Sequence, residues 1–415
     1  MSHSLEQTLD QKWLLPQGVL ELLPDQAEQL ENMRRLCVDL YHSRGYRLVA
    51  PPLMEYLEAL LTGSDLELDL RTLKITDQLS GRLMGVRADI TPQVARMDAH
   101  ELQTQTNQIN RLCYVGSVLH AKPSDLLSPR TFEQTGVEIY GHAGIESDRE
   151  ALEILIETCY LASDSANLTI NVGHLGVCYQ MCDYFYRQAN APVSKIEKSQ
   201  FMKAVATKCS ASLEALSSAW GFSNPVREAL LGWVNLQGGV EILEDLLPRA
   251  VAVLKEERLV EGLQQTLQPL AKKYPKVSWF LDCSEPMGYA YHTGLVYAVY
   301  ADAPVPVASG GRYDGLGEPF GRSRPATGFS ADLLALSELR QSALETGSGA
   351  NIIWAPVEPD PVRSVLLDRK IQQLRAASHP VSQAFSEHEQ PADGQPYLTF
   401  DQGEWVVSRK VQTSE

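Results

Sequence analysis

The alternation of apolar and polar residues predicts a helix near the start of the chain. Residues 24–44 begin with Pro24 and Asp25, which are typical of a first helical turn. Apolar residues then recur at the spacing of one helical face, at Ala27, Leu30, Met33, Cys37, Leu40 and Tyr41. Gly45 is well placed to end this helix. Residues 46–49 predict a short strand that stops before the Pro51–Pro52 pair.

Short strand-like runs dominate the segment that follows. They lie at Leu73–Thr76, Leu83–Val86, Leu112–Leu119, Gly136–Tyr140 and Leu168–Val172. Polar turns join the first four runs, which favours antiparallel pairing over parallel crossovers. We expect helices at residues 91–100 and from Ser147 onward, where Ser147 and Glu150 have the spacing of a capping box.

Helical periodicity takes over at residues 185–270 and predicts a helical insertion that projects from the sheet. Strand-like runs return at 277–281 and 294–301, and a glycine-rich loop at 310–317 leads to a helix at 331–344. Gly347, Ser348 and Gly349 are typical of a linker. Residues 350–415 predict one short strand, one helix and a hairpin, which is little material for an independently stable domain.

Charge and cysteine usage narrow the functional classes. Acidic residues outnumber basic ones, 52 to 36, for a net charge of −16, whereas nucleic-acid-binding proteins usually carry a basic footprint. The seven cysteines form no CxxC pair, so a metal site is not expected. No apolar run reaches the ~18 residues of a membrane span, and residues 1–11 do not resemble a signal peptide. We therefore expect a cytoplasmic protein without membrane contacts.

The segment VRADITPQVAR (86–96) is the first candidate for site chemistry. Arg87 and Asp89 alternate with apolar neighbours, so both are expected on one side of a strand. Thr91 opens the next helix and is a candidate N-cap. A surface strand followed by a capping threonine explains the same pattern equally well.

The second candidate segment, residues 130–138, contains Arg130, Phe132, Gln134 and Glu138. Gln134 and Glu138 are four residues apart on a predicted strand and therefore face the same side. An amide and a carboxylate that point into one cavity suit an ammonium or imidazole ligand. The alternative is a solvated outer face of the sheet.

The third candidate is a pair of glycine-rich loops, GYAYHTG (288–294) and ASGGRYDG (308–315), which carry Tyr291 and Tyr313. Two such loops beside a strand can close over a small ligand, although a tight hairpin turn also explains the second one. Neither loop is a Walker or a GxGxxG phosphate loop, and the chain has no GxSxG or HExxH motif.

Taken in order, these segments resemble the catalytic core of histidyl-tRNA synthetases over roughly residues 14–345. The motifs that carry the resemblance are RLCYVGSVLHAKPSDLLSPRTFEQTGVEIYG (111–141), SGGRYDGL and PATGFSADLLAL. The resemblance implies an α+β fold of the class II aminoacyl-tRNA synthetase type, an antiparallel sheet flanked by helices. It divides the chain into core (1–184), helical insertion (185–270), core (271–346) and a short C-terminal α/β remnant (347–415), like an abbreviated anticodon-binding domain.

Three positions depart from the synthetase pattern. His120, Met287 and Ala335 stand where the family has arginines that hold ATP. Adenylate formation needs positive groups against the charge that develops on phosphate, and neither methionine nor alanine replaces a guanidinium. The departures imply that amino-acid activation is lost and that no cofactor is bound. The short C-terminal region and the acidic balance also disfavour tRNA binding.

The texts GYAYHTGLV and SPRTFEQTGVE resemble the regulatory subunits of ATP phosphoribosyltransferase, paralogues of the synthetases, more than true synthetases. This resemblance implies a non-catalytic protein of histidine biosynthesis that dimerises through its core. It would join the short catalytic subunit, which condenses ATP with phosphoribosyl pyrophosphate, in a hetero-octamer. It would activate that subunit and confer feedback inhibition by histidine. The alternatives are a divergent histidyl-tRNA synthetase and an RNA-binding or sensor module on the same fold.

Site roles follow from the synthetase resemblance. Histidine's amino group would lie at Asp89, with Thr91 beside it, and Gln134 and Glu138 would contact the amino group or the imidazole. Three further residues complete the implied pocket, with tyrosine walls and one positive group near the carboxylate end: Tyr291, Tyr313 and Arg130.

Overall fold

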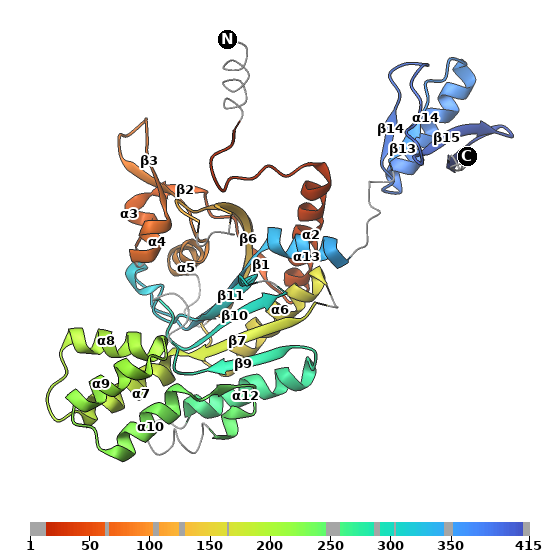
Figure 1. Ribbon diagram of the computed structural model, residues 1–415. Helices are drawn as coiled ribbons and strands as arrows, with labels where there is room; N and C mark the ends of the chain where they lie inside the picture. Colours follow the sequence, from red (N-terminus) through yellow and green to blue (C-terminus); the bar gives the residue numbers. More distant parts are fainter. Residues whose placement is uncertain are drawn as a thin grey trace, which may run out of the picture. The chain divides into compact units, whose positions relative to one another are not determined.

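The computed structural model describes residues 14–62, 66–102, 108–123, 129–163, 166–245, 258–285, 291–302, 304–343 and 352–409. The chain forms two compact units, which divide between Ala343 and Leu344. In Figure 1 the second, smaller unit is blue.

A nine-stranded sheet organises the first unit, in the order β1-β5-β6-β12-β11-β10-β7-β9-β8. Pairing is antiparallel except between β1 and β5 and between β7 and β9. The strands are β1 (Arg47–Leu48), β5 (Asn110–Leu119), β6 (Thr131–Tyr140), β7 (Leu168–His174), β8 (Gln237–Gly238), β9 (Ser278–Asp282), β10 (Leu295–Ala301), β11 (Ala308–Arg312) and β12 (Ala326–Asp332). The predicted mainly antiparallel sheet is confirmed.

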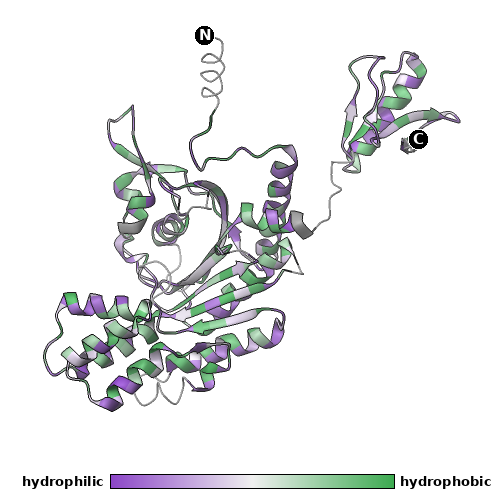
Figure 2. Ribbon diagram, viewed as in Figure 1, coloured by the Kyte–Doolittle hydropathy of each residue, from purple (hydrophilic) through white to green (hydrophobic). Residues whose placement is uncertain are grey.

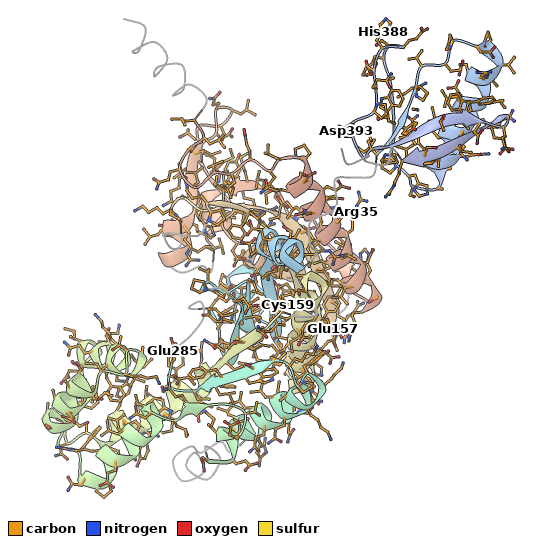
Figure 3. All side chains as sticks on the ribbon, turned by 45° about the vertical axis from the view of Figure 1, so that its right-hand side comes forward. Arg35, Glu157, Cys159, Glu285, His388 and Asp393 are labelled. Carbon is orange, nitrogen blue, oxygen red and sulfur yellow. The ribbon has the colours of Figure 1, made fainter. Side chains whose placement is uncertain are left out.

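Helices lie against both faces of this sheet. Three pack on one face and on one another: α2 (Pro24–Ser43), α6 (Ile145–Ala162) and α13 (Leu333–Ala343). The fully buried Cys159 of α6 belongs to this main core, whereas Glu157 pairs with Arg44 at its edge (Figure 3). On the other face, α5 (Thr91–His100) shares a smaller core with Tyr114, Tyr140 and Tyr313. This second face carries the candidate site.

A three-stranded sheet stands beside α5. It pairs β2 (Met54–Tyr56) and β3 (Leu73–Thr76) with β4 (Leu83–Val86), and the short helices α3 (Leu57–Leu60) and α4 (Leu66–Arg71) connect its strands. Residues 87–90, which follow β4, lead from this sheet directly into α5.

The described residues of the first unit hold five further helices: α7 (Leu175–Gln188), α8 (Lys195–Ala206), α9 (Ser210–Ala219), α10 (Asn224–Val234) and α12 (Arg258–Lys273). Their core is aromatic, and the Phe185 ring stacks on Trp233 with a centroid separation of 5.8 Å. Apolar and polar residues alternate along these helices at helical spacing (Figure 2). Helices at 185–270 were predicted, but α7 begins at Leu175, inside the segment assigned to the core. The division of this unit into core and insertion stays a prediction.

The second unit is a four-stranded sheet with one helix. Its elements are β13 (Ile353–Ala355), α14 (Pro361–Ala376), β14 (Val381–Gln383), β15 (Pro396–Asp401) and β16 (Glu404–Arg409), in the sheet order β14-β13-β15-β16. The helix covers Ile353, Ala355 and Leu398. The predicted strand, helix and hairpin are present, and β14 adds a strand that the sequence did not reveal.

Local features of the sequence explain where most elements end. The opening helix ends at Ser43, one residue before the predicted end, and Gly45 follows it with a φ of 83° that other residues rarely reach. The helix α5 occupies exactly the predicted range, 91–100.

Four local predictions were wrong. The segment predicted as a glycine-rich loop at 310–317 belongs to β11 as far as Arg312, and the helix predicted at 331–344 begins at Leu333, directly after β12. Thr91 does not cap α5, because the Asp89 Oδ1 atom accepts the Thr91 N–H instead, at 3.1 Å. Ser147 does not begin α6 either, since that helix starts at Ile145 and the Glu150 carboxylate is held by Arg111 at 2.7 and 2.8 Å. Arg87 and Asp89 lie beyond the end of β4 and not on a strand.

None of the described helices is long and apolar enough to cross a lipid bilayer. In the same residues, no group of three His, Cys, Asp or Glu side chains has the geometry of a metal site.

Candidate functional site

Gln134 and Glu138 lie on the same face of β6, as their spacing predicts, and both are buried. Their strand lies between β5 and β12, with Leu112 and Gly328 in register with Glu138. A β-carbon at position 328 would clash with the Glu138 carboxylate. The glycine on the neighbouring strand therefore leaves the space that the Glu138 side chain occupies.

Asp89 reaches the same face from the segment between β4 and α5. Its Oδ1 atom accepts a hydrogen bond from Gln134 Nε2 at 2.9 Å, and Gln134 Oε1 in turn accepts the Ile90 N–H at 2.9 Å. Its Oδ2 atom accepts from the Tyr291 hydroxyl at 3.4 Å. These bonds tie the start of α5 to β6 and fix the Asp89 carboxylate beside Thr91.

The Glu138 carboxylate is surrounded by hydroxyl groups. The Tyr114 hydroxyl donates to Oε1 at 3.2 Å and shares a further bond of 3.3 Å with the Thr91 hydroxyl, while the Tyr313 hydroxyl donates to Oε2. Burial raises the pKa of Glu138 well above its ordinary value, and the nearby Asp89 charge adds to this. Among the described residues, the donors to both carboxylates are hydroxyls, an amide and a backbone N–H.

Aromatic rings enclose these carboxylates. Tyr291 stacks on His292 with a centroid separation of 4.7 Å, and both rings meet Tyr313 edge-on, at 5.8 and 6.1 Å. The space left between Thr91, Glu138 and the rings is a cavity of about 20 Å³. That volume suits one water-sized group, so the walls must move apart for a larger ligand.

A larger cavity of about 280 Å³ adjoins this pocket. The two share Ser309 and Ser330, and Gln134 lines the larger one. Its remaining lining includes His120, Phe132, Arg71 and Asp332. The site is therefore a small acidic pocket that opens toward a roomier, mixed-polarity cavity.

Two of the three positions at which the sequence resemblance predicts lost arginines are described, and His120 lies in the larger cavity. His120 lines it, with Nε2 3.1 Å from the Ala88 carbonyl oxygen and its ring edge-on to Phe132 at 5.2 Å. Burial lowers the pKa of His120, which favours the neutral ring. Ala335 lies in the first turn of α13 and donates its N–H to Asp332. Met287 falls outside the described residues.

Arg130 is placed apart from both cavities. Its guanidinium donates to the carbonyl oxygens of His120 at 2.9 Å and Gln17 at 3.4 Å, and its own backbone N–H donates to Gly18. It lines neither cavity. The other six sequence-predicted residues of the pocket converge on one face of the sheet.

Sequence reasoning missed Tyr114 and Arg312, and it left His292, a histidine in a glycine-rich loop, out of the predicted pocket. Tyr114 lies two residues from Leu112 on β5 and therefore shares its face. Because Leu112 is the register partner of Glu138, this places Tyr114 beside the pocket, but the sequence alone does not give the register. Arg312 precedes Tyr313 and is buried, where it donates to Asp148 at 3.0 Å and to the Gly144 carbonyl oxygen at 3.1 Å. These bonds fix the end of β11 against the start of α6 and so position Tyr313.

Comparison with known proteins identifies the family. The family model described as histidyl-tRNA synthetase matches residues 18–336. An ATP phosphoribosyltransferase regulatory subunit from Thioalkalivibrio sulfidiphilus is 41% identical over 380 residues, which cover 90% of this chain and 92% of the relative. The chain belongs to the ATP phosphoribosyltransferase regulatory subunit family.

Solved structures confirm the class II synthetase-like fold of this regulatory-subunit family member. A protein from Bacillus halodurans titled as an ATP phosphoribosyltransferase regulatory subunit/histidyl-tRNA synthetase superimposes with a TM-score of 0.75 at 22% identity, covering 91% of this chain and 94% of its own. A histidyl-tRNA synthetase from a Nostoc species gives a TM-score of 0.74 at 19% identity, with coverage of 96% and 97%. At these identities the likeness establishes the fold alone.

Proposed function

We propose that this regulatory subunit assembles with the short catalytic subunit of ATP phosphoribosyltransferase, raises its activity and makes it sensitive to histidine. The observation that carries the proposal is the Glu138 carboxylate, buried between the Tyr114 and Tyr313 hydroxyls, close to a second carboxylate at Asp89. A buried acidic pocket in which no described Lys or Arg side chain pairs with the carboxylates favours a ligand that brings its own positive charge.

Histidine has the groups that this pocket requires. Its ammonium would lie between Asp89, Thr91 and the Gln134 side chain, which the structure holds together. Its imidazole would hydrogen-bond to Glu138 between the rings of Tyr291 and Tyr313. Pairing with the positive charge or the hydrogen-bond donors of histidine would offset the free-energy cost of burying the Asp89 and Glu138 carboxylates. The predicted contribution of Arg130 gains no support from its placement.

The proposal assigns no catalysis to the subunit itself. His120 and Ala335 supply no positive charge to the larger cavity, and position 287 is a methionine. In addition, Asp332 Oδ1 accepts the N–H groups of Leu334 at 2.9 Å and Ala335 at 3.2 Å. The start of α13, a natural place for a phosphate, is thus already occupied by a carboxylate. Arg71 is the one arginine in the described lining of this cavity, so ATP activation there is disfavoured on both counts.

Feedback inhibition requires that histidine bind two states of the complex with different affinity, with a coupling typically of ~1–3 kcal/mol. The cavity of about 20 Å³ at Glu138 is too small for an amino acid. Binding would therefore displace the tyrosine-bearing segments around residues 291 and 313. This displacement is the proposed local event that the complex translates into inhibition.

The decisive experiment mixes the full chain with a short-form catalytic subunit. We expect co-elution in size-exclusion chromatography, at a mass that also tests the proposed hetero-octamer and the dimeric core. We also expect a higher initial rate with the chain than without it, and loss of that gain with added histidine. The Glu138→Gln variant should still co-elute and activate but should lose the response to histidine. Glu133→Gln, on the opposite face of β6, is the matched control.

Two outcomes would contradict the proposal. Absence of co-elution together with an unchanged rate would leave no regulatory role. Histidine-dependent ATP–pyrophosphate exchange by the chain alone would instead reveal a divergent synthetase. A histidine response that survives in Glu138→Gln would retain the regulatory function but remove the pocket from it.

A further inference from the structure

The sheet of the second unit has one face that α14 does not cover. Along β13, Ile353 and Ala355 point to the α14 core, so Trp354 between them points to the opposite face. Tyr397 on β15 is the register partner of Trp354 and shares that face. Both rings are partly exposed. The uncovered face thus carries two adjacent aromatic side chains.

Residues 384–395, here called the strap, connect β14 to β15. Both strands run parallel to β13, which lies between them. Right-handed crossovers place α14 on one face of such a sheet and the returning connection on the other. The strap is fixed at both ends, because the Ala384 N–H donates to the Ala355 carbonyl at 2.9 Å and Gln395 Nε2 donates to the Ile352 carbonyl at 3.0 Å.

A cavity of about 270 Å³ lies between the strap and the aromatic face. Trp354 and Tyr397 contribute its aromatic lining, and Pro356 and Pro391 add apolar walls. Two carboxylates of the strap, Glu387 and Glu389, complete its rim and are exposed. The Glu389 carboxylate also accepts the Phe385 N–H at 3.1 Å, which holds it against the strap backbone.

The charge around this cavity has a single sign. In residues 352–360 and 384–401, every Asp, Glu, Lys or Arg is a carboxylate: Glu358, Asp360, Glu387, Glu389, Asp393 and Asp401. His388 and Asp393 mark the strap in Figure 3. The nearest basic residues in the sequence are engaged elsewhere, since Arg363 lies 4.7 Å from the centre of the Phe400 ring and Arg375 donates to the Val381 carbonyl. The field at the cavity therefore attracts cations and repels phosphate groups.

We infer that this cavity receives the guanidinium or ammonium group of a basic side chain on a partner protein. Aromatic faces attract such cations, and the rim carboxylates supply charge-assisted hydrogen bonds to them. The cavity is slightly smaller than the ~300–1,000 Å³ usual for small-molecule sites, which suits a single side chain. Phe385, 97% exposed next to the rim, provides the kind of aromatic contact that protein interfaces bury. This inference is independent of the histidine pocket and of the proposed regulatory role.

The test follows the indole N–H resonance of Trp354 in the full chain labelled with ¹⁵N-tryptophan, with Trp354→Phe to assign the signal. The probes are the blocked tripeptide Gly-Arg-Gly, its lysine and citrulline counterparts, free arginine, and a short single-stranded RNA. We expect the arginine and lysine peptides to shift the resonance in a saturable way, and citrulline, which lacks the charge, to bind at least about tenfold more weakly.

Charge variants make the test specific to the rim. Glu387→Gln with Glu389→Gln should weaken the arginine peptide about tenfold or more. The control, Asp368→Asn with Glu404→Gln, removes the same charge from exposed positions that do not line the cavity, and should change affinity by less than about twofold.

Several results would overturn the inference. Equal binding of the citrulline peptide would show that charge is not recognised, and equal weakening by the control pair would show attraction to net charge alone. If free arginine bound but the Gly-Arg-Gly peptide did not, the cavity would be a small-molecule site and not a docking site. A shift caused by RNA, or no shift with any peptide, would remove the cationic partner altogether.

Discussion

Gly328 on β12 lies in register with Glu138 on β6, and a β-carbon at position 328 would clash with both the Glu138 carboxylate and the Val137 carbonyl oxygen. The Glu138 carboxylate occupies the space next to β12 that a side chain at position 328 would otherwise fill, so this position requires a glycine. The acidic pocket therefore depends on a glycine that makes no polar contact with any ligand.

Gly328→Ala should disrupt the pocket from its floor. Because one clashing atom belongs to the backbone, the strands must shift, and we expect a loss of about 1–3 kcal/mol in the free energy of unfolding. Histidine binding, followed by calorimetry with the assembled complex, should be lost as well. Gly315→Ala is the matched control, since a β-carbon there meets no atom within 4 Å; an equal effect of the two substitutions would refute the steric argument.

Glu138→Gln should separate charge from shape in the same pocket. Glutamine keeps the size and an acceptor oxygen for the Tyr114 hydroxyl but cannot balance a ligand's positive charge. We expect the dissociation constant for histidine to rise by about tenfold to a hundredfold, the loss typical of one charge-assisted contact. The variant should unfold at the same or a higher denaturant concentration at neutral pH, because burial of an ionised Glu138 is unfavourable. Calorimetry and urea denaturation measure the two effects; unchanged affinity would exclude Glu138 as a ligand contact.

Arg312→Met should test the buried ion pair that holds the end of β11 against the start of α6. The guanidinium bonds to Asp148 and to the Gly144 carbonyl within the protein interior, so its removal leaves a buried carboxylate without a partner, a loss of about 3–5 kcal/mol. Adding Asp148→Asn should recover part of this, because the uncompensated charge is then gone. Urea denaturation of the two single variants and the double variant gives the coupling energy. Strictly additive effects would show that the pair is not coupled.

Parts of this fold are readable from sequence because they depend on short spacings. The range of α5 follows from its helical periodicity, and the shared face of Gln134 and Glu138 follows from the two-residue period of a strand. The sequence could not show which face is buried, since that depends on the register of β5 and β12 against β6.

The mistaken capping box at Ser147 arises from competition by a distant residue. Ser147 and Glu150 have the spacing of a capping box, but Arg111 takes the Glu150 carboxylate from another element. Arg130 was assigned to the ligand through the synthetase resemblance, and this role stays a prediction, although its partners Gln17 and Gly18 are more than a hundred positions away in the chain. No local pattern encodes such contacts.

The Asp332 carboxylate should make stability depend on pH. Burial raises its pKa from an ordinary 3.8 to about 6, although the N–H groups of Ala335 and Leu334 partly oppose this. Between these values the unfolded chain has released its proton while the folded chain retains it, so stability falls as the pH rises through this window. Asp332→Asn keeps an acceptor for both N–H groups but does not ionise. We expect the variant to gain stability relative to the wild type between about pH 4 and pH 6, on the order of 1–2 kcal/mol, and to hold that gain above it.

Urea denaturation at several pH values between 4 and 8 measures this difference, with Asp39→Asn, an exposed position on α2, as the control for general charge effects. A flat difference across the range would mean that Asp332 titrates normally. The same variant bears on nucleotide exclusion: because the start of α13 stays capped by the asparagine oxygen, the loss of one charge alone should not create ATP binding. ATP bound by Asp332→Asn in calorimetry, but not by the wild type, would show that the carboxylate's charge, and not the residues at positions 120, 287 and 335, is what keeps phosphate out of this cavity.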